Sequence, residues 1–271
     1  MITSWRPLHE NHAIDVMALA LVFREPLPTQ MLRQVLRDAE QQAKAGGLGT
    51  AQPHTSYEFT LNRNDVTPIA KSGALFNAYF EPQSDSAVPD TVAEQIQIDQ
   101  NAIVYRTWRY VSWNYHRKRV QTLVGPVLSN IIPVVGLANA RLEYRDVFYF
   151  DGSTADIDNG LLFQKQSRFI VPNAFNHQYE WHSHTGNFVE ENDVSKKLLQ
   201  IAINAVDEQD DQKSTKRRTD VMTARENRYQ PNVEINAEAV FNDMNSAHDE
   251  LISTMSELLT KDMAKRIYLK D

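Results

Sequence analysis

The side chains best suited to chemistry lie close together in the segment 179–184, which reads Tyr-Glu-Trp-His-Ser-His. On an extended strand Glu180, His182 and His184 share one face, because successive side chains alternate. Two imidazoles two residues apart can chelate zinc or nickel, and a catalytic site also needs a third protein ligand. The candidates for that third ligand are Glu180, His54 and His116. The pattern therefore suggests a metal-dependent enzyme, and the alternative is an exposed polar strand face or a turn near Gly186.

Aromatic and basic side chains are interleaved in a second segment, Tyr105–Arg119, which contains no acidic residue. Aromatic rings stack on bases and cations hold phosphates in proteins that bind single-stranded nucleic acid. The residues that would carry nucleic-acid or nucleotide binding are Trp108, Arg109, Trp113, Arg117, Lys118 and Arg119. A further basic group, at a predicted hairpin, consists of Lys213, Lys216, Arg217 and Arg218. The alternative places the aromatic rings in the core and the cations on a solvated helix face.

One histidine, His248, lies on an apolar stripe of the predicted last helix. The other members of the stripe are Phe241, Met244, Leu251, Met255 and Leu258. Steps of three and four residues form one continuous seam, which packs on the core or pairs with a second chain. On such a seam we expect His248 to be a buried, hydrogen-bonded residue rather than a catalytic base.

Acidic side chains gather in two short runs. The runs are Glu190, Glu191 and Asp193, and then Asp207, Glu208, Asp210 and Asp211. Neither has the alternating ligand positions and the glycine of a calcium-binding loop. We interpret them as solvated turns, with an electrostatic docking surface as the alternative.

The composition of the 271-residue chain excludes several classes of function. A net charge of −7 argues against nucleic-acid binding through bulk positive charge, although a local basic face is compatible with it. The absence of cysteine excludes thiol nucleophiles, disulfides and cysteine-ligated metal centres. The glycine-rich segment 46–49 lacks the lysine and hydroxyl residue of a phosphate-binding loop, and no nucleophile-elbow or zinc-protease motif occurs.

The apolar segments predict a cytoplasmic protein without membrane contact. Residues 1–11 contain no apolar stretch of signal-peptide length. The most apolar region, 120–142, is interrupted by Pro126, Asn130, Pro133 and Asn139, so it falls short of the roughly 20 apolar residues of a membrane span.

Hydrophobic periodicity predicts the elements that must position these side chains. In the first half the predicted strands are 13–23, 57–61, 75–81, 94–99 and 102–108. A helical repeat over 31–43 ends at Gly46–Gly47, and a second helix begins near Ser112 with a break or kink at Gly125–Pro126. The short turn Asp99–Asn101 joins two of the strands into a hairpin, because Asx residues readily bend the backbone.

After Pro133 the pattern begins again. The predicted strands are 134–150, 168–189, 197–206 and 215–225, and a short helix covers 155–163. The polar turn 207–214 joins the last two strands. The chain closes with a long helix, for which Asn236 is the predicted N-cap and Glu238 lies in the first turn, where the helix dipole favours a carboxylate.

These elements predict an α+β fold in which long antiparallel sheet packs around amphipathic helices. Both halves of the chain, 1–133 and 134–271, can be written as strand, helix, several strands and helix. The halves are two pseudo-duplicated domains in one interpretation and a single continuous domain in the other.

Several short motifs occur together in an order that resembles a known family. The hairpin segments Gln95–Ile98 and Ile103–Tyr105 precede Tyr110 and Trp113, in the form Y-x-x-W at a helix start. The strand 140–148 reads Ala-Arg-Leu-Glu-Tyr-Arg-Asp-Val-Phe, and the last helix carries His248 before Thr260. This order resembles a sporadically distributed family of uncharacterised prokaryotic proteins. The chain departs from the family pattern at Asn245, where an aspartate is expected, and at Asp146, where an asparagine is expected.

The resemblance implies an accessory role such as toxin control or phage defence. Together with the missing catalytic motifs, it predicts a non-enzymatic binding or regulatory protein that acts on a protein partner or as a homo-oligomer. The alternatives are a metal-dependent enzyme that uses His182 and His184, and a nucleic-acid or nucleotide binder that uses Tyr105–Arg119.

Overall fold

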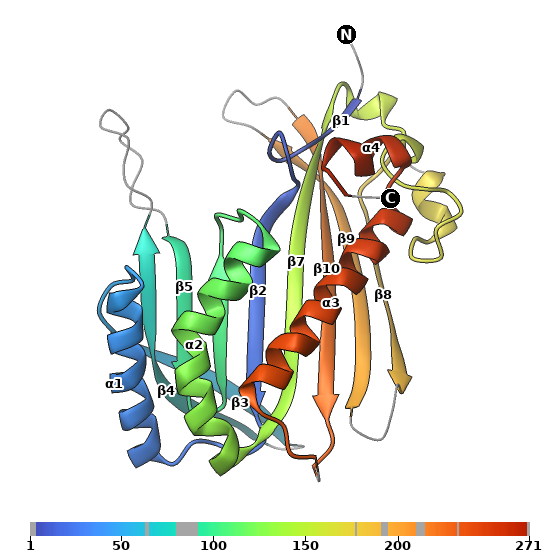
Figure 1. Cartoon of the computed structure of the whole chain (residues 1–271). Helices are drawn as coiled ribbons and strands as arrows, with labels where there is room; N and C mark the ends of the chain where they lie inside the picture. The colour runs from blue at the N-terminus through green and yellow to red at the C-terminus, as the bar shows by residue number, and fades with distance from the viewer. Residues whose placement is uncertain are drawn as a thin grey trace, which may run out of the picture. The chain divides into compact units, whose positions relative to one another are not determined.

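Figure 1 shows a computed structural model of the chain, which describes residues 4–62, 65–79, 92–176, 178–190, 195–209, 215–231 and 233–269. Within these residues the chain has an α+β fold, with ten strands in a long antiparallel sheet and four α-helices. The predicted fold class is confirmed. None of the helices in this part of the chain combines the length and the apolar character that a membrane span needs.

The strands follow the hydrogen-bonded order β3-β4-β5-β6-β2-β7-β10-β9-β8, and β1 pairs with β7. The first six are β1 (Ser4–Pro7), β2 (Ile14–Phe23), β3 (Gln52–Asn62), β4 (Asp65–Tyr79), β5 (Val92–Asp99) and β6 (Ala102–Thr107). The others are β7 (Leu137–Asp151), β8 (Trp181–Glu190), β9 (Ser195–Gln209) and β10 (Thr215–Tyr229). The helices are α1 (Thr29–Ala45), α2 (Trp113–Val135), α3 (Ala237–Leu258) and α4 (Lys261–Arg266).

The chain divides into two compact units, each assembled from segments that are distant in sequence. Unit 1 contains residues 1–17, 142–227 and 245–271, and unit 2 contains residues 18–141 and 228–244. The duplication of the halves 1–133 and 134–271 stays a prediction.

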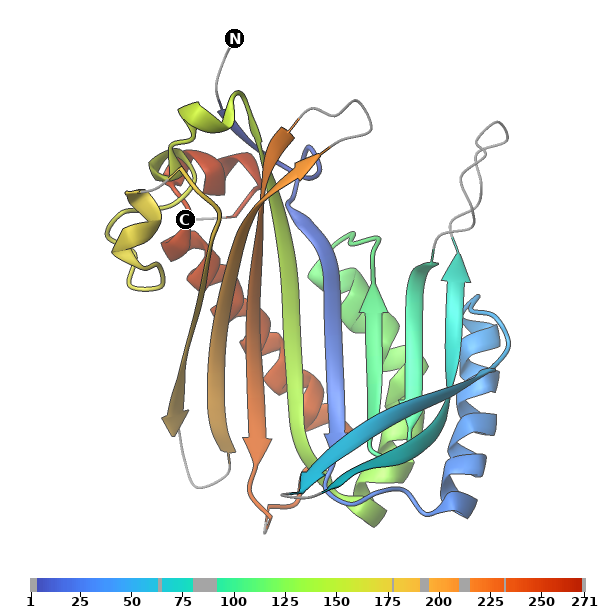
Figure 2. The same cartoon turned by 180° about the vertical axis from the view of Figure 1, so that it is seen from behind.

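In unit 2, helices α1 and α2 cover one face of β4, β5 and β6, and Figure 2 shows these strands from the side opposite the helices. The predicted helix over 31–43 is confirmed, because α1 buries Leu32, Val35, Ala39 and Ala43 along one stripe. Gly46 follows α1, and a side chain there would collide with Leu123 of α2. The glycine therefore allows the close approach of the two helices.

The hairpin between β5 and β6 is confirmed, together with its turn. The carboxylate of Asp99 accepts hydrogen bonds from the backbone N–H groups of Asn101 and Ala102, at 2.7 and 3.0 Å. Ser112 caps α2 by accepting a hydrogen bond from the N–H of Tyr115 at 3.3 Å. Of the predicted break or kink at Gly125–Pro126, the break is wrong, since the helix continues through both residues, and the kink stays a prediction. Proline removes one hydrogen bond, and the apolar packing on either side offsets that loss.

In unit 1, the part of α3 that belongs to this unit lies over β9 and β10 (Figure 1). The apolar members of the stripe predicted for α3 are buried, whereas His248 is half-buried. Asn236 is the N-cap as predicted, because its side-chain oxygen accepts a hydrogen bond from the N–H of Ala239 at 2.8 Å. The short predicted helix over 155–163 is replaced by two 3-10 turns, Thr154–Asp156 and Asn159–Leu161.

The long strand predicted over 168–189 is wrong in its first half. Residues Pro172–Phe175 form a 3-10 turn, and the strand β8 begins only at Trp181. Proline at the first position of that turn fixes φ and lacks the N–H that a sheet ladder requires. The predicted polar turn 207–214 begins later than expected, because β9 extends to Gln209, and residues 210–214 lie outside the described residues.

Candidate functional site

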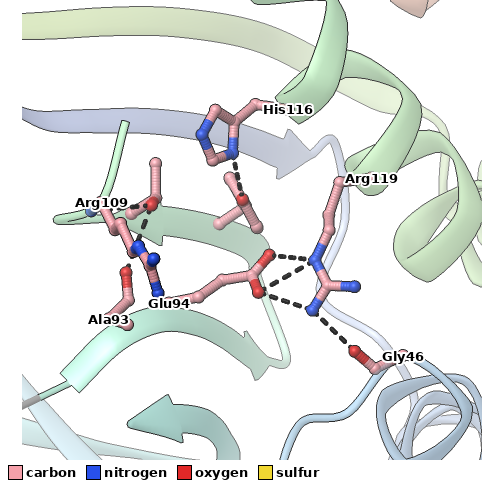
Figure 3. A network of polar contacts seen from close by, with 8 residues as sticks. Gly46, Ala93, Glu94, Arg109, His116 and Arg119 are labelled. Carbon is pink, nitrogen blue, oxygen red and sulfur yellow. Dashed lines mark hydrogen bonds and ion pairs between the residues drawn. The ribbon is translucent and has the colours of Figure 1, made fainter. Parts of the chain in front are cut away.

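A tyrosine from a strand and a histidine from a helix meet inside unit 2 (Figure 3). The hydroxyl of Tyr105 on β6 lies 2.8 Å from Nδ1 of His116 on α2. The backbone N–H of Val111 donates to Nε2 of the same ring at 3.2 Å. Because Nε2 accepts, the ring proton resides on Nδ1 and is donated to the Tyr105 oxygen.

An ion pair between Glu94 and Arg119 completes this cluster (Figure 3). Nε of Arg119 lies 2.8 and 2.9 Å from the two carboxylate oxygens of Glu94, and Nη2 lies 2.6 Å from one of them. Nη2 also donates to the carbonyl oxygen of Gly46 at 2.7 Å, which ties the end of α1 to α2. Both side chains are largely buried, so a bidentate pair of this kind is shielded from water.

The surroundings hold the titratable groups of the cluster in one charge state. Burial lowers the pKa of His116 to about 4, despite the nearby charge of Glu94, so the ring is neutral at physiological pH. Burial, followed by the charge of Glu94 and a hydrogen bond to it, raises the pKa of the Tyr105 hydroxyl. Neither group gains or loses a proton near neutrality. We therefore interpret the cluster as a rigid connection between α1, α2 and two strands.

The predicted nucleic-acid residues separate into inner and outer groups. Trp113 is buried and Arg119 forms an ion pair with Glu94, so both side chains contribute to the interior of unit 2. Arg117 and Trp108 are half-buried, and Arg117 donates to the side-chain oxygen of Asn242 at 3.4 Å. Two of the six predicted residues, Arg109 and Lys118, are well exposed.

The predicted metal ligands do not form a cluster. His182 and His184 are exposed on β8, opposite Asn204 and Ala202 of β9. His116 is already hydrogen-bonded on both nitrogens, and His54 lies on β3. Among the residues that the structure describes, no group of three histidine or acidic side chains could hold a metal ion.

The third predicted ligand, Glu180, belongs to an open pocket of about 480 Å³. One of its carboxylate oxygens accepts a hydrogen bond from the backbone N–H of Asp207 at 2.9 Å. The pocket is lined by Thr154, Ala155, Gln178, Tyr179, Glu180 and Asp207.

Two arginines of the basic group predicted at the hairpin, Arg217 and Arg218, are paired with acidic neighbours. Arg217 has a fully buried side chain, and its Nε lies 2.6 Å from the carboxylate of Asp207. Its other nitrogens donate to the carbonyl oxygens of Gln178 and Tyr179, at 2.7 and 3.3 Å. Arg218 pairs with Glu208 and Asp220, at 2.9 and 2.8 Å. The other acidic and basic residues predicted here, Lys213, Asp210, Asp211, Glu191 and Asp193, lie outside the described residues.

A second tyrosine and histidine meet inside unit 1. The hydroxyl of Tyr144 on β7 lies 2.9 Å from Nδ1 of His248 on α3, and the two rings make an edge contact. Burial lowers the pKa of His248. The predicted hydrogen bond of His248 is confirmed, with Tyr144 as its partner, but the residue is half-buried rather than fully buried.

Beside this pair, Asp146 is only 5% exposed and lines a small cavity of about 40 Å³. Burial raises the pKa of this carboxyl to about 7. Sequence reasoning noted Asp146 only as a departure from a family motif. The sequence does contain one signal for this site. Asp146 directly precedes two apolar residues of a long strand, Val147 and Phe148, and a charge in such an apolar setting is costly.

Comparison with known proteins leaves the site to be interpreted from its own geometry. No protein-family model and no curated protein matches the chain.

Proposed function

We propose that the chain is a non-enzymatic binding protein that pairs with an extended segment of a partner protein along strand β8. The observation that carries this proposal is the free edge of a long strand. β8 is the last strand in the hydrogen-bonded order and is paired along all ten residues with β9. Among the described residues, no backbone hydrogen bond links residues 181–190 to a loop.

The sequence of β8 lacks the devices by which natural proteins protect sheet edges. Such edges are blunted by proline, lysine, bulges or a very short strand. Residues 181–190 contain no proline, lysine or arginine, and their register with β9 shows no shift. Two apolar side chains, Phe188 and Val189, are 51% and 46% exposed. A strand of this kind is suited to strand addition, in which main-chain hydrogen bonds supply affinity.

The charge around β8 favours a basic partner. Glu180 immediately precedes the strand and shares the open pocket with Asp207, whose carboxylate is already paired with Arg217. The whole chain carries a net charge of −7, which attracts cationic surfaces and repels a second copy of itself. We therefore infer that the partner presents an extended segment with lysine or arginine.

The two alternatives have weaker support. The metal hypothesis requires a third ligand, and His182 and His184 lie on β8 without one among the described residues. The nucleic-acid hypothesis retains Arg109 and Lys118 as exposed cations, whereas Arg119 neutralises Glu94. A role in toxin control or phage defence remains what the family resemblance implies.

The proposal is tested by selecting displayed random peptides on the purified protein and measuring backbone hydrogen exchange with a selected peptide bound. We expect selected peptides to be basic and to slow exchange in residues 181–190. Val189→Lys places a charge on the strand and should weaken binding at least tenfold. The matched control is Val171→Lys, because Val171 is an equally exposed valine of the same unit outside the sheet.

Three results would contradict the proposal. Protection of residues 105–119 in place of 181–190 would move the binding surface to the other unit. Equal weakening by both lysine variants would show that β8 is not the contact. A concentration-dependent dimer with β8 protected in the absence of peptide would identify a second copy as the occupant.

A further inference from the structure

We propose that the small cavity beside Asp146 is a binding site for a small primary amine in its ammonium form. This site is distinct from the β8 edge, and it does not depend on the function proposed above. All of its lining residues belong to unit 1. They are His12, Ala13, Ile14, Tyr144, Asp146, Thr223, Leu251, Ile252, Met255, Ile267 and Leu269.

The first argument is that Asp146 has no partner. The residue as a whole is 5% exposed, and its carboxyl forms no hydrogen bond or ion pair with any residue that the structure describes. Burial is accordingly the one cause that shifts its pKa. Buried carboxylates in proteins are normally paired, because an isolated charge in an apolar environment is costly. A buried carboxyl that lacks a counterion and lies beside a cavity is suited to bind a positively charged ligand.

The second argument concerns the charges that face Asp146 from each surrounding segment. His12 precedes β2, and burial lowers its pKa. His248 of α3 is bonded to Tyr144, and burial lowers its pKa as well. On β10, Arg225 lies two residues after the lining residue Thr223 and pairs with Glu250 at 2.6 Å. The wall residues contributed by α3 and by the C-terminal segment are apolar, so no lining residue supplies a cation at neutral pH.

The size and the polarity of the cavity define the ligand. A volume of about 40 Å³ exceeds the roughly 10–15 Å³ that one water needs, so it accommodates about three non-hydrogen atoms. Most of the wall is aliphatic and suits a short alkyl chain, and the wall also includes Thr223 and Tyr144, whose hydroxyl is bonded to His248. A divalent metal such as calcium requires at least six oxygen ligands, which this lining does not offer. Ethylammonium matches both the size and the charge.

A ligand could reach the cavity by way of the segment that follows α4. Ile267 and Leu269 form part of the wall, and they follow α4, a helix of six residues. Between them Tyr268 has a φ of 57° and an exposed side chain. A non-glycine residue in this left-handed region costs on the order of 1 kcal/mol, which lowers the cost of displacing the segment. Displacement of Ile267 and Leu269 would open the cavity to solvent.

The experiment measures binding of ethylammonium chloride to the purified chain by calorimetry and by NMR, at pH 8.5 and at pH 5.5. We expect binding to be more than tenfold tighter at pH 8.5, because the ammonium ion pairs with the ionised carboxyl. Cross-relaxation between the ethyl protons and the methyl group of Met255 would locate the ligand. Ethanol, a neutral molecule of the same size, should bind at least tenfold more weakly at pH 8.5.

Two variants distinguish the role of the Asp146 carboxyl from a general effect of removing one negative charge. Asp146→Asn keeps the shape of the side chain and should abolish the binding of ethylammonium. Asp156→Asn is the matched control, because Asp156 is an exposed carboxylate of the same unit. The proposal is overturned if Asp146→Asn retains binding, if ethanol binds as tightly, or if the contact with Met255 is absent. Binding that does not change between the two pH values would also overturn it.

Discussion

Each of the two units contains a tyrosine–histidine hydrogen bond in its interior, but the charged groups around the two bonds differ. In each, a tyrosine on a strand is hydrogen-bonded to a histidine on a helix, at 2.8 Å for Tyr105–His116 and at 2.9 Å for Tyr144–His248. In each, burial lowers the pKa of the histidine. The units differ in what accompanies the pair.

In unit 2 the nearby carboxylate, Glu94, is neutralised by Arg119, whereas in unit 1 Asp146 has no cation beside it. The first carboxylate is thus part of a closed network, and the second can change its charge near neutral pH. The lesson is that a counterion decides whether a buried carboxyl acts as a structural connection or stays available for a ligand. The predictions below test this contrast.

The largest expected effect comes from removing the counterion in unit 2. Arg119→Leu leaves Glu94 charged and buried, and we expect the free energy of unfolding to fall by about 4 kcal/mol. Urea unfolding at pH 7 measures this change. The double variant Glu94→Gln, Arg119→Leu should recover more than half of the loss, because no uncompensated charge remains. A double variant as unstable as the single one would show that the arginine acts through packing alone.

The carboxyl of unit 1 should behave in the opposite way. Its pKa is about 7 in the folded chain, so the unfolded chain loses this proton first as the pH rises above about 4. Asp146 therefore lowers stability progressively between pH 4 and pH 7, and the penalty is complete above pH 7. We expect Asp146→Asn to unfold like the natural chain at pH 4 and to be about 4 kcal/mol more stable at pH 8.

The difference between the variant and the natural chain is the quantity to measure for Asp146. The lowered pKa values of His12, His116 and His248 make the stability of both proteins increase with pH below about 6.5, which opposes the effect of the carboxyl. Subtraction removes this shared contribution. A difference that stays constant from pH 4 to pH 8 would show that Asp146 does not titrate in this range.

A smaller loss of stability is expected when either tyrosine loses its hydroxyl, and the loss should be larger at Tyr105 than at Tyr144. Tyr105→Phe leaves a fully buried histidine and a glutamate without their hydroxyl partner, which should cost about 2 kcal/mol. Tyr144→Phe leaves the half-buried His248 accessible to water, and should cost below about 1 kcal/mol. Chemical unfolding of the two variants at pH 7 tests the order. Equal losses would indicate that the two hydrogen bonds occupy equivalent environments.

The smallest effect is expected at the exposed histidines of unit 1. The double variant His182→Ala, His184→Ala should change stability by less than about 0.5 kcal/mol, as is usual for surface substitutions. Melting temperatures measured with and without added zinc provide the check. Stabilisation by zinc in the natural chain that disappears in the variant would favour the metal hypothesis over strand pairing.

Much of the fold could be predicted because its signals are local. The stripe of α1, the Asp99 turn and the Asn236 cap each depend on residues within a few positions of one another. The start of β8 differs from the prediction because Phe169, Ile170 and Val171 form an apolar run typical of a strand, while Pro172 redirects the chain into a 3-10 turn.

The candidate sites were harder to predict, because their partners are distant in sequence. Arg119 looks like a solvated cation until Glu94 of β5 is placed beside it, and Arg217 looks exposed until Asp207 and two carbonyl groups surround it. The sequence contains both tyrosines and both histidines, but it does not show which tyrosine is hydrogen-bonded to which histidine. The isolation of Asp146 is a property of the assembled core, and no local pattern encodes it.

The arrangement around Gly46 has a consequence for evolution. This residue contributes a carbonyl oxygen to Arg119 and leaves space for Leu123, so one position satisfies two constraints. Loss of the arginine would leave Glu94 with an uncompensated charge, which selection should remove soon afterwards. In divergent descendants of this sequence, we expect the glycine, the glutamate and the arginine to be inherited or replaced together. Their covariation would then reveal kinship after overall sequence identity has faded.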